Sequence, residues 1–146
     1  MSPITVLIAD QNKARRAACV RLLQPEKGIR LVGRAQSGLE ALSATAKLKP
    51  RILLLSLNLL KINTIAQLCF FRQKSPQTKV ILLTRRASKA RVLDALSYGT
   101  RGYIEEKVLR TLLAKAVRCV DAGEAWLPRK MVARIIEHLA HPSACE

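Results

Sequence analysis

Five short runs of apolar residues organise this chain, and they are separated by stretches in which apolar positions recur every three or four residues. The clearest runs are "ITVLIA" at 4–9, "RILLLSL" at 51–57 and "VILLT" at 80–84. Two weaker runs, at 30–35 and 102–105, complete the set. Continuous apolar runs of this length are typical of strands that are buried on both faces. We therefore predict five strands at these positions.

A helical pattern follows each predicted strand. The clearest helix is 108–120, where apolar residues at 109, 112, 113, 116, 117 and 120 form one stripe. Further helices are predicted to about residue 23, from 39 to the stop at Pro50, and over 63–73, 87–98 and 129–139. Strands that alternate with helices need crossover connections, which produce a parallel sheet with helices on both faces. The length of 146 residues is typical of one domain.

Ligand sites in parallel α/β folds lie beyond the carboxyl ends of the strands. The positions to consider are therefore Asp10 and Gln11 after the first strand, and Ser56 near the end of the third. Thr84 ends the fourth predicted strand, and Glu106 follows the fifth.

The charge of the chain is unusual, because 26 Lys and Arg face 10 Asp and Glu, for a net charge of +16. The basic residues, Arg15 and Arg16 among them, are spread along the chain without a single block. Such a surface attracts nucleic acid and other anions, although a well-solvated basic surface explains it equally well.

Other features narrow the class of protein. No apolar run is long enough to span a membrane, and the N-terminus lacks the basic region of a signal peptide. The four cysteines are far apart and form no CxxC motif, so we expect free thiols, a cytoplasmic location and no metal site. No Gly-rich phosphate loop or nucleophile–base pair is evident, so we expect neither an enzyme nor a cofactor.

Several stretches resemble the receiver domain of bacterial response regulators of the NarL/LuxR branch. "VLIADQN" is similar to "VLLADDH" of that branch, "VGRAQSGLEAL" to "VGEAGDGEEAL", and "ALSYGTRGYIEEK" to "ALRAGARGYLLKD". The similarity runs in order from about residue 4 to 139. It implies a flavodoxin-like (CheY-like) sheet of five parallel strands in the order 2-1-3-4-5, with an additional C-terminal helix.

The resemblance also implies a phosphorylation site, which this sequence has only in part. Asp10 matches the first of two acids that hold Mg²⁺, but Gln11 stands at the second. Ser56 stands at the aspartate that accepts phosphate, and Glu106 stands at the lysine that neutralises it, with Lys107 displaced by one. Thr84 matches the hydroxyl that binds the phosphoryl group. Tyr103 matches the aromatic residue that reports the change.

We therefore interpret the chain as a pseudo-receiver that is not phosphorylated. A carboxylate restored at Ser56 alone is expected to meet only like charges, from Asp10 and Glu106. The expected role is a dimerisation and signalling module, with residues 1–124 as the receiver-like domain. Residues 125–146 would form a helix and the start of a linker. In the family this leads to a DNA-binding helix-turn-helix that this chain lacks, and a sensor kinase is a further possible partner.

An alternative role is ligand sensing, with cyclic di-GMP or another anionic nucleotide as the ligand. "WLPR", from Trp126 to Arg129, resembles a motif of LuxR-type receivers that bind cyclic di-GMP, although Pro128 replaces its Ser or Thr. A tryptophan and an arginine can stack on a guanine and pair with a phosphate. The competing interpretation is that Trp126 packs the last helix against the sheet domain.

Overall fold

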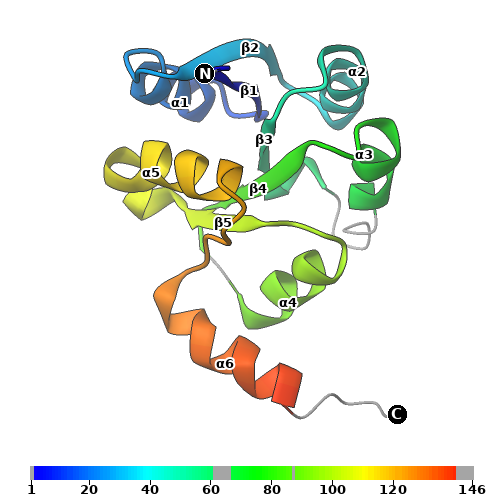
Figure 1. Cartoon of the computed structure of the whole chain (residues 1–146), viewed down its shortest axis with the longest axis vertical. Coiled ribbons are helices and arrows are strands. Elements are labelled where there is room, and N and C mark those ends of the chain that lie inside the picture. Colours follow the sequence, from blue (N-terminus) through cyan, green and yellow to red (C-terminus); the bar gives the residue numbers. More distant parts are fainter. Residues whose placement is uncertain (1, 61–66, 87, 141–146) are drawn as a thin grey trace.

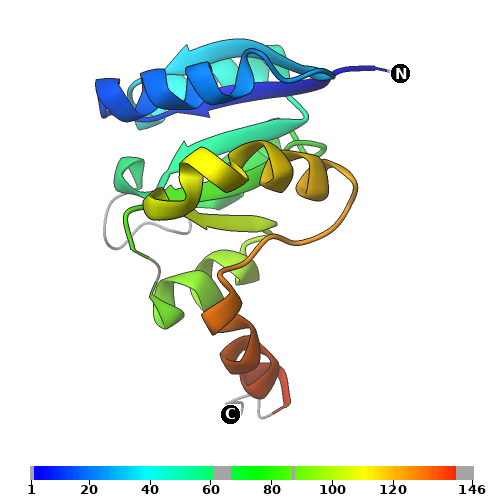
Figure 2. The same ribbon diagram turned by 90° about the vertical axis from the view of Figure 1, so that its left-hand side faces the viewer.

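The computed structural model describes residues 2–60, 67–86 and 88–140, and these form a three-layer α/β sandwich (Figures 1 and 2). All pairings in the central sheet are parallel, and the strand order β2-β1-β3-β4-β5 confirms the predicted order. The strands are β1 (Ile4–Ala9), β2 (Ile29–Ala35), β3 (Ile52–Ser56), β4 (Lys79–Thr84) and β5 (Gly102–Glu105). Each lies within a residue or two of its predicted position.

The helices alternate with the strands as the pattern predicted. They are α1 (Lys13–Leu23), α2 (Gly38–Leu48), α3 (Leu68–Lys74), α4 (Lys89–Ser97), α5 (Leu109–Asp121) and α6 (Arg129–Ala140). Short 3₁₀ turns, η1 (Leu57–Leu59) and η3 (Glu106–Val108), follow β3 and β5. The start of the helix predicted at 63–73 lies outside the described residues, as does the tail after residue 140. None of the helices in the described ranges is long and apolar enough to cross a membrane.

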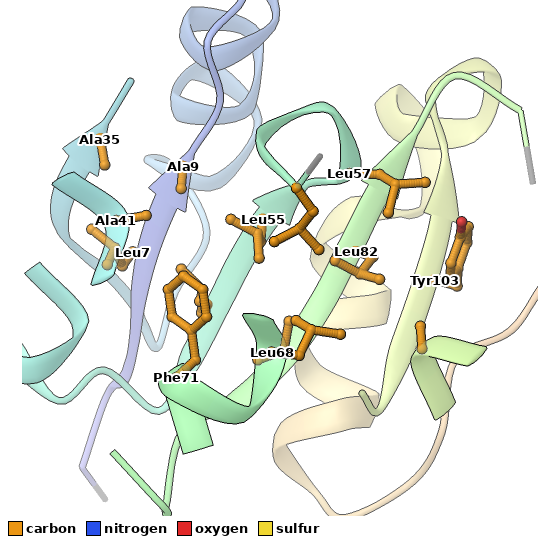
Figure 3. Close-up of a cluster of buried hydrophobic side chains, with 14 of the residues drawn as sticks. Leu7, Ala9, Ala35, Ala41, Leu55, Leu57, Leu68, Phe71, Leu82 and Tyr103 are labelled. Carbon is orange, nitrogen blue, oxygen red and sulfur yellow. The ribbon is translucent and has the colours of Figure 1, made fainter. Parts of the chain in front are cut away.

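Alternation along the strands divides the core into two layers. On one face, Leu7, Leu55 and Leu82 pack against residues of α2, α3 and α4 (Figure 3). On the other face, Ile8 and Leu54 pack against α1 and α5. Residues on alternate sides of a fully covered strand are all apolar, which is why these strands read as continuous runs.

The chain after α5 returns to the sheet along β5. Gly123, at a φ of +97°, makes the turn that ends α5. Trp126 N–H then donates to the carbonyl of Arg101 at 3.0 Å, and Tyr103 N–H donates to the carbonyl of Trp126 at 2.8 Å. Because these bonds lie on the outer edge of β5, they cover that edge and fix where α6 begins.

Candidate functional site

Asp10 is buried at the carboxyl end of β1, where the guanidinium of Arg15 holds its carboxylate. Arg15 Nε donates to Oδ2 at 2.5 Å, and Arg15 Nη2 donates to Oδ1 at 2.8 Å. The backbone N–H of Asn12 donates to the same Oδ1 at 2.9 Å. Bidentate pairs of a guanidinium with a carboxylate are among the strongest hydrogen-bonded contacts in proteins. Asp10 is therefore fully engaged by groups of this chain.

The same guanidinium reaches the ends of two other strands. Arg15 Nη2 lies 3.3 Å from Ser56 Oγ at the end of β3, in hydrogen-bond geometry. Arg15 Nη1 lies 3.7 Å from Glu106 Oε2, just after β5. One cation thus connects Asp10, Ser56 and Glu106, which come from three strand ends.

Local sequence explains why Arg15 points into this pocket. The side chain of Asn12 caps α1 by accepting a hydrogen bond from Arg15 N–H at 2.8 Å, so Arg15 is fixed in the first helical turn. Arg16 also stabilises the connection between β1 and α1, because its Nη1 donates to the backbone carbonyl of Asp10 at 2.6 Å. The guanidinium of Arg15 makes hydrogen bonds and ion pairs that raise the pKa of Arg15 above its usual value, and the bond to Asp10 is the largest contribution. Arg15 is therefore a permanent cation.

Two of the predicted pocket residues take no part in this network. Gln11 is exposed, and Thr84 Oγ1 donates to the carbonyl of Arg86 at 3.2 Å. Lys107 is also turned away, because its Nζ lies 3.9 Å from Glu105 Oε1 and its side chain is 70% exposed. The structure gathers three of the five predicted pocket positions around Arg15 and leaves the other two outside its contacts.

These residues do not fit Mg²⁺. The ion needs several oxygen ligands in near-octahedral geometry. Both oxygens of Asp10 already accept hydrogen bonds from Arg15, whose own charge repels a divalent cation. Among the described residues, no group of three or more His, Cys, Asp or Glu is arranged to hold a metal ion.

A second candidate region lies on the other side of β5, where Trp126 and Arg129 line a cavity of about 690 Å³. Trp126 is half-buried and packs against the core layer of α1 and α5. Arg129 is exposed at the first position of α6. Both residues predicted from the "WLPR" motif therefore face one hollow. Binding of cyclic di-GMP there stays a prediction.

The comparisons with known proteins decide the family. The response regulator receiver domain family matches residues 6–118, which is most of the chain. This chain belongs to that family. The transcriptional regulatory protein LnrK of Bacillus subtilis is 26% identical over 91% of this chain and 60% of its own length. The nitrate/nitrite response regulator NarL of Escherichia coli is 28% identical over 86% of this chain and 58% of its own.

Solved structures agree in fold. The RcsB response regulator of Salmonella typhimurium superposes with a TM-score of 0.82 at 20% identity, covering 92% of this chain and 69% of that one. The chain is thus a receiver domain of the NarL/LuxR type, and it spans about 60% of the length of the curated relatives LnrK and NarL.

Two buried groups of this receiver have shifted pKa values. Burial raises the pKa of the Tyr103 hydroxyl on β5 to about 12, and Tyr103 is 1% exposed. Burial also raises the pKa of Cys19 on α1 to about 12, with a smaller contribution from the charge of Asp10. Both groups are therefore neutral in the folded protein at physiological pH.

The central residue of the pocket, Arg15, was not foreseen from the sequence. The sequence shows Arg15 only as one of many dispersed basic residues. None of the family's five phosphorylation positions that were compared with this sequence is a cation on α1. A signal existed in the segment "DQNKAR", where Asn12 is a good helix cap and Arg15 is the third residue after it. That spacing turns residue 15 back toward the end of the preceding strand.

Proposed function

We propose that this receiver domain acts without phosphoryl transfer, as a binding and positioning module of a transcriptional regulator in the cytoplasm. The observation that carries the proposal is the guanidinium of Arg15, which is bonded to Asp10 and Ser56 and paired with Glu106. The resemblance implies that, in the family, a lysine after the fifth strand supplies the positive charge of this pocket. Here the cation is built into α1 and the carboxylate is after β5.

Charge and reactivity both support this proposal. A sensor kinase needs a carboxylate at position 56, and a serine hydroxyl needs an activating base that Arg15, a permanent cation, cannot supply. Arg15 also pairs with the carboxylates of both Asp10 and Glu106, so each acid has a partner within the protein without an added ligand. The ion pairs hold α1 and η3 at a fixed spacing, which favours one conformation of the pocket.

The proposed output is to present a DNA-binding part as a dimer. LnrK is named a transcriptional regulatory protein, and the RcsB structure concerns DNA interaction. The segment from residue 125 onward, which includes α6, would lead toward such a part. Three large apolar side chains of α6, at positions 132, 136 and 139, are 40%, 60% and 72% exposed. Their spacing places them on one side of the helix, which supports a contact with a second copy.

The phosphorylation part is tested by intact-protein mass spectrometry after incubation with acetyl phosphate and Mg²⁺. We expect no added phosphoryl group on the natural sequence. The positive control carries Gln11→Asp, Ser56→Asp and Glu106→Lys together with Arg15→Ala, which restores the family's ligands and removes the built-in cation. Phosphoryl uptake by the natural chain that disappears in Ser56→Ala would refute the proposal.

The dimer part is tested separately by sedimentation velocity. We expect Ile136→Asp, on the exposed face of α6, to shift the protein toward the monomer. Leu39→Asp is the matched control, because Leu39 is 83% exposed on α2. A monomer at all concentrations, or equal effects of the two substitutions, would remove the dimer from the proposal and leave the pocket argument standing.

A further inference from the structure

Two neighbouring hollows near the carboxyl end of β5 differ in chemistry, and we call them the apolar half and the polar half. The first half is the cavity of about 690 Å³ between β5, the start of α5 and the segment that leads into α6. Its walls are mainly apolar, and include Val108, Leu112, Trp126, Leu127 and Val132. A volume of this size is within the range of small-molecule sites, which are mostly lined by apolar and aromatic side chains.

The second half is a polar hollow of about 600 Å³ beside it. Its walls combine the arginine pair after β4 with the residues after β5 and the start of α6: Arg85, Arg86, Glu105, Glu106, Lys107 and Lys130. The two hollows share Glu105, Lys107 and Lys130 in their linings, so they lie side by side, and we refer to them together as the groove. Four cations and two carboxylates line the polar half, which leaves a surplus of two positive charges.

The carboxylates of this groove already have partners. Glu105 is buried and lies 3.9 Å from Lys107 Nζ and 3.6 Å from Lys130 Nζ. Glu106 also lines the polar half, and its Oε2 lies 3.7 Å from Arg15 Nη1. Neither carboxylate is therefore an open site for a cation. The exposed pair Arg85 and Arg86 gives the rim of the polar half its unbalanced charge.

We propose that this groove binds a small aromatic phosphate, with the ring in the apolar half against Trp126 and the phosphate between Arg85, Arg86 and Lys130. Guanidinium groups bind phosphate through two parallel hydrogen bonds, and two arginines in sequence suit a group with three free oxygens. A phosphate dianion also matches the surplus of two positive charges in the polar half. An indole face provides the flat apolar surface that an aromatic ring needs.

This site shares Glu106 with the network around Arg15, but the proposed ligand contacts are Trp126, Arg85, Arg86 and Lys130, so it does not depend on how the phosphorylation question is decided. It also extends the sequence prediction, because the "WLPR" motif names only residues 126 and 129. The arginine pair comes from the end of another strand, some forty residues earlier in the chain.

The test uses guanosine 5′-monophosphate and pyridoxine 5′-phosphate. Comparing the two shows whether the groove prefers a nucleotide or a smaller ring that carries a phosphate. Binding is measured by calorimetry and by the fluorescence of Trp126, the single tryptophan of the chain. We expect saturable binding of at least one of the two, with a change in Trp126 emission. Guanosine and inorganic phosphate, which each offer half of the chemistry, should bind at least about tenfold more weakly.

The matched variants are Arg85→Ala/Arg86→Ala and Arg30→Ala/Arg34→Ala. Both remove two exposed cations, but the second pair lies on β2 at the opposite edge of the sheet. We expect roughly a tenfold or greater loss of affinity in the first variant and little change in the second. Equal losses in both would show attraction by net charge alone and would overturn the proposal. Absence of saturable binding at millimolar concentration, or equal binding of inorganic phosphate, would overturn it as well.

Discussion

The pocket around Arg15 and the groove beside Trp126 meet at the end of β5, where two consecutive carboxylates have different partners. Glu106 pairs with Arg15 in the pocket, whereas Glu105 pairs with Lys107 and Lys130 in the groove. In the pocket, one cation with a 12% exposed side chain serves two carboxylates and a hydroxyl. In the groove, four cations face two carboxylates, and Lys107 and Lys130 are more than half exposed. Both carboxylates of the pocket are paired with the one cation there, whereas the groove has a surplus of positive charge for a ligand.

The largest expected effect is in the pocket. Arg15→Ala leaves the buried carboxylate of Asp10 without its bidentate partner, and breaking a buried pair in this way typically costs about 3–5 kcal/mol. We expect a loss of that size in the free energy of unfolding, measured by urea denaturation at neutral pH. Lys13→Ala, an exposed change on the same helix, should cost less than about 0.5 kcal/mol. A small loss for Arg15→Ala would show that Asp10 is adequately satisfied by backbone donors.

Alkaline pH should lower the free energy of unfolding through two buried groups, one in each region. Cys19 lies beside the pocket, Tyr103 lines the groove, and burial raises both pKa values to about 12. Because the unfolded chain releases these protons at lower pH, the stabilisation is complete below about pH 9 and is lost as the pH rises toward 12. We expect the free energy of unfolding to fall by roughly 2–4 kcal/mol between pH 9 and 11.

Single substitutions assign that loss to its source. Cys19→Ala should remove the larger share, since its ordinary pKa of 9.0 is lower than the 10.0 of Tyr103. Tyr103→Phe should remove the smaller share, and mainly above pH 10. An unchanged slope in both variants would mean that other groups control alkaline unfolding.

The two regions also differ in how far the sequence predicts them. The core strands could be predicted from continuous apolar runs, because a strand covered on both faces needs apolar side chains at nearly every position. The order of the strands followed from the resemblance. Asp10, Ser56 and Glu106 were expected at the strand ends, and in the structure Arg15 contacts all three. The partner that joins them was not expected, because the direction of a long side chain depends on the cap at Asn12 and on the charges already present. The pairing of Trp126 with β5 was also missed, since it uses backbone groups that carry no residue-specific signal.

Arg15 reverses one expectation for the pocket. From the sequence, Ser56→Asp was predicted to meet only like charges. The structure corrects this, because Arg15 Nη2 lies 3.3 Å from Ser56 Oγ and would attract the new carboxylate. Two unit charges about 4 Å apart interact by roughly 4 kcal/mol at an effective dielectric constant near 20, so attraction and repulsion are of similar size.

The single Ser56→Asp variant should therefore change the free energy of unfolding by no more than about 1 kcal/mol, and should still accept no phosphate. In the Arg15→Ala background the same substitution should be markedly destabilising. A double-mutant cycle measures the coupling, which we expect to be about 1–3 kcal/mol in favour of the pair. A coupling near zero would place Arg15 away from position 56 in solution.

The smallest effect should come from the groove. Lys130 lies 3.6 Å from Glu105, but its side chain is 55% exposed and therefore screened by water. Lys130→Ala leaves Glu105 with Lys107, so we expect a loss below about 1 kcal/mol in the free energy of unfolding, decreasing further with added salt. Arg134→Ala, also exposed on α6, is the matched control and should cost no more. Because α6 is attached at this point, hydrogen exchange of its first turns should nevertheless become faster in Lys130→Ala than in the control. A loss comparable to that of Arg15→Ala would contradict the distinction between a closed pocket and an open groove, since an ion pair that water can reach should not stabilise as much as one from which water is excluded.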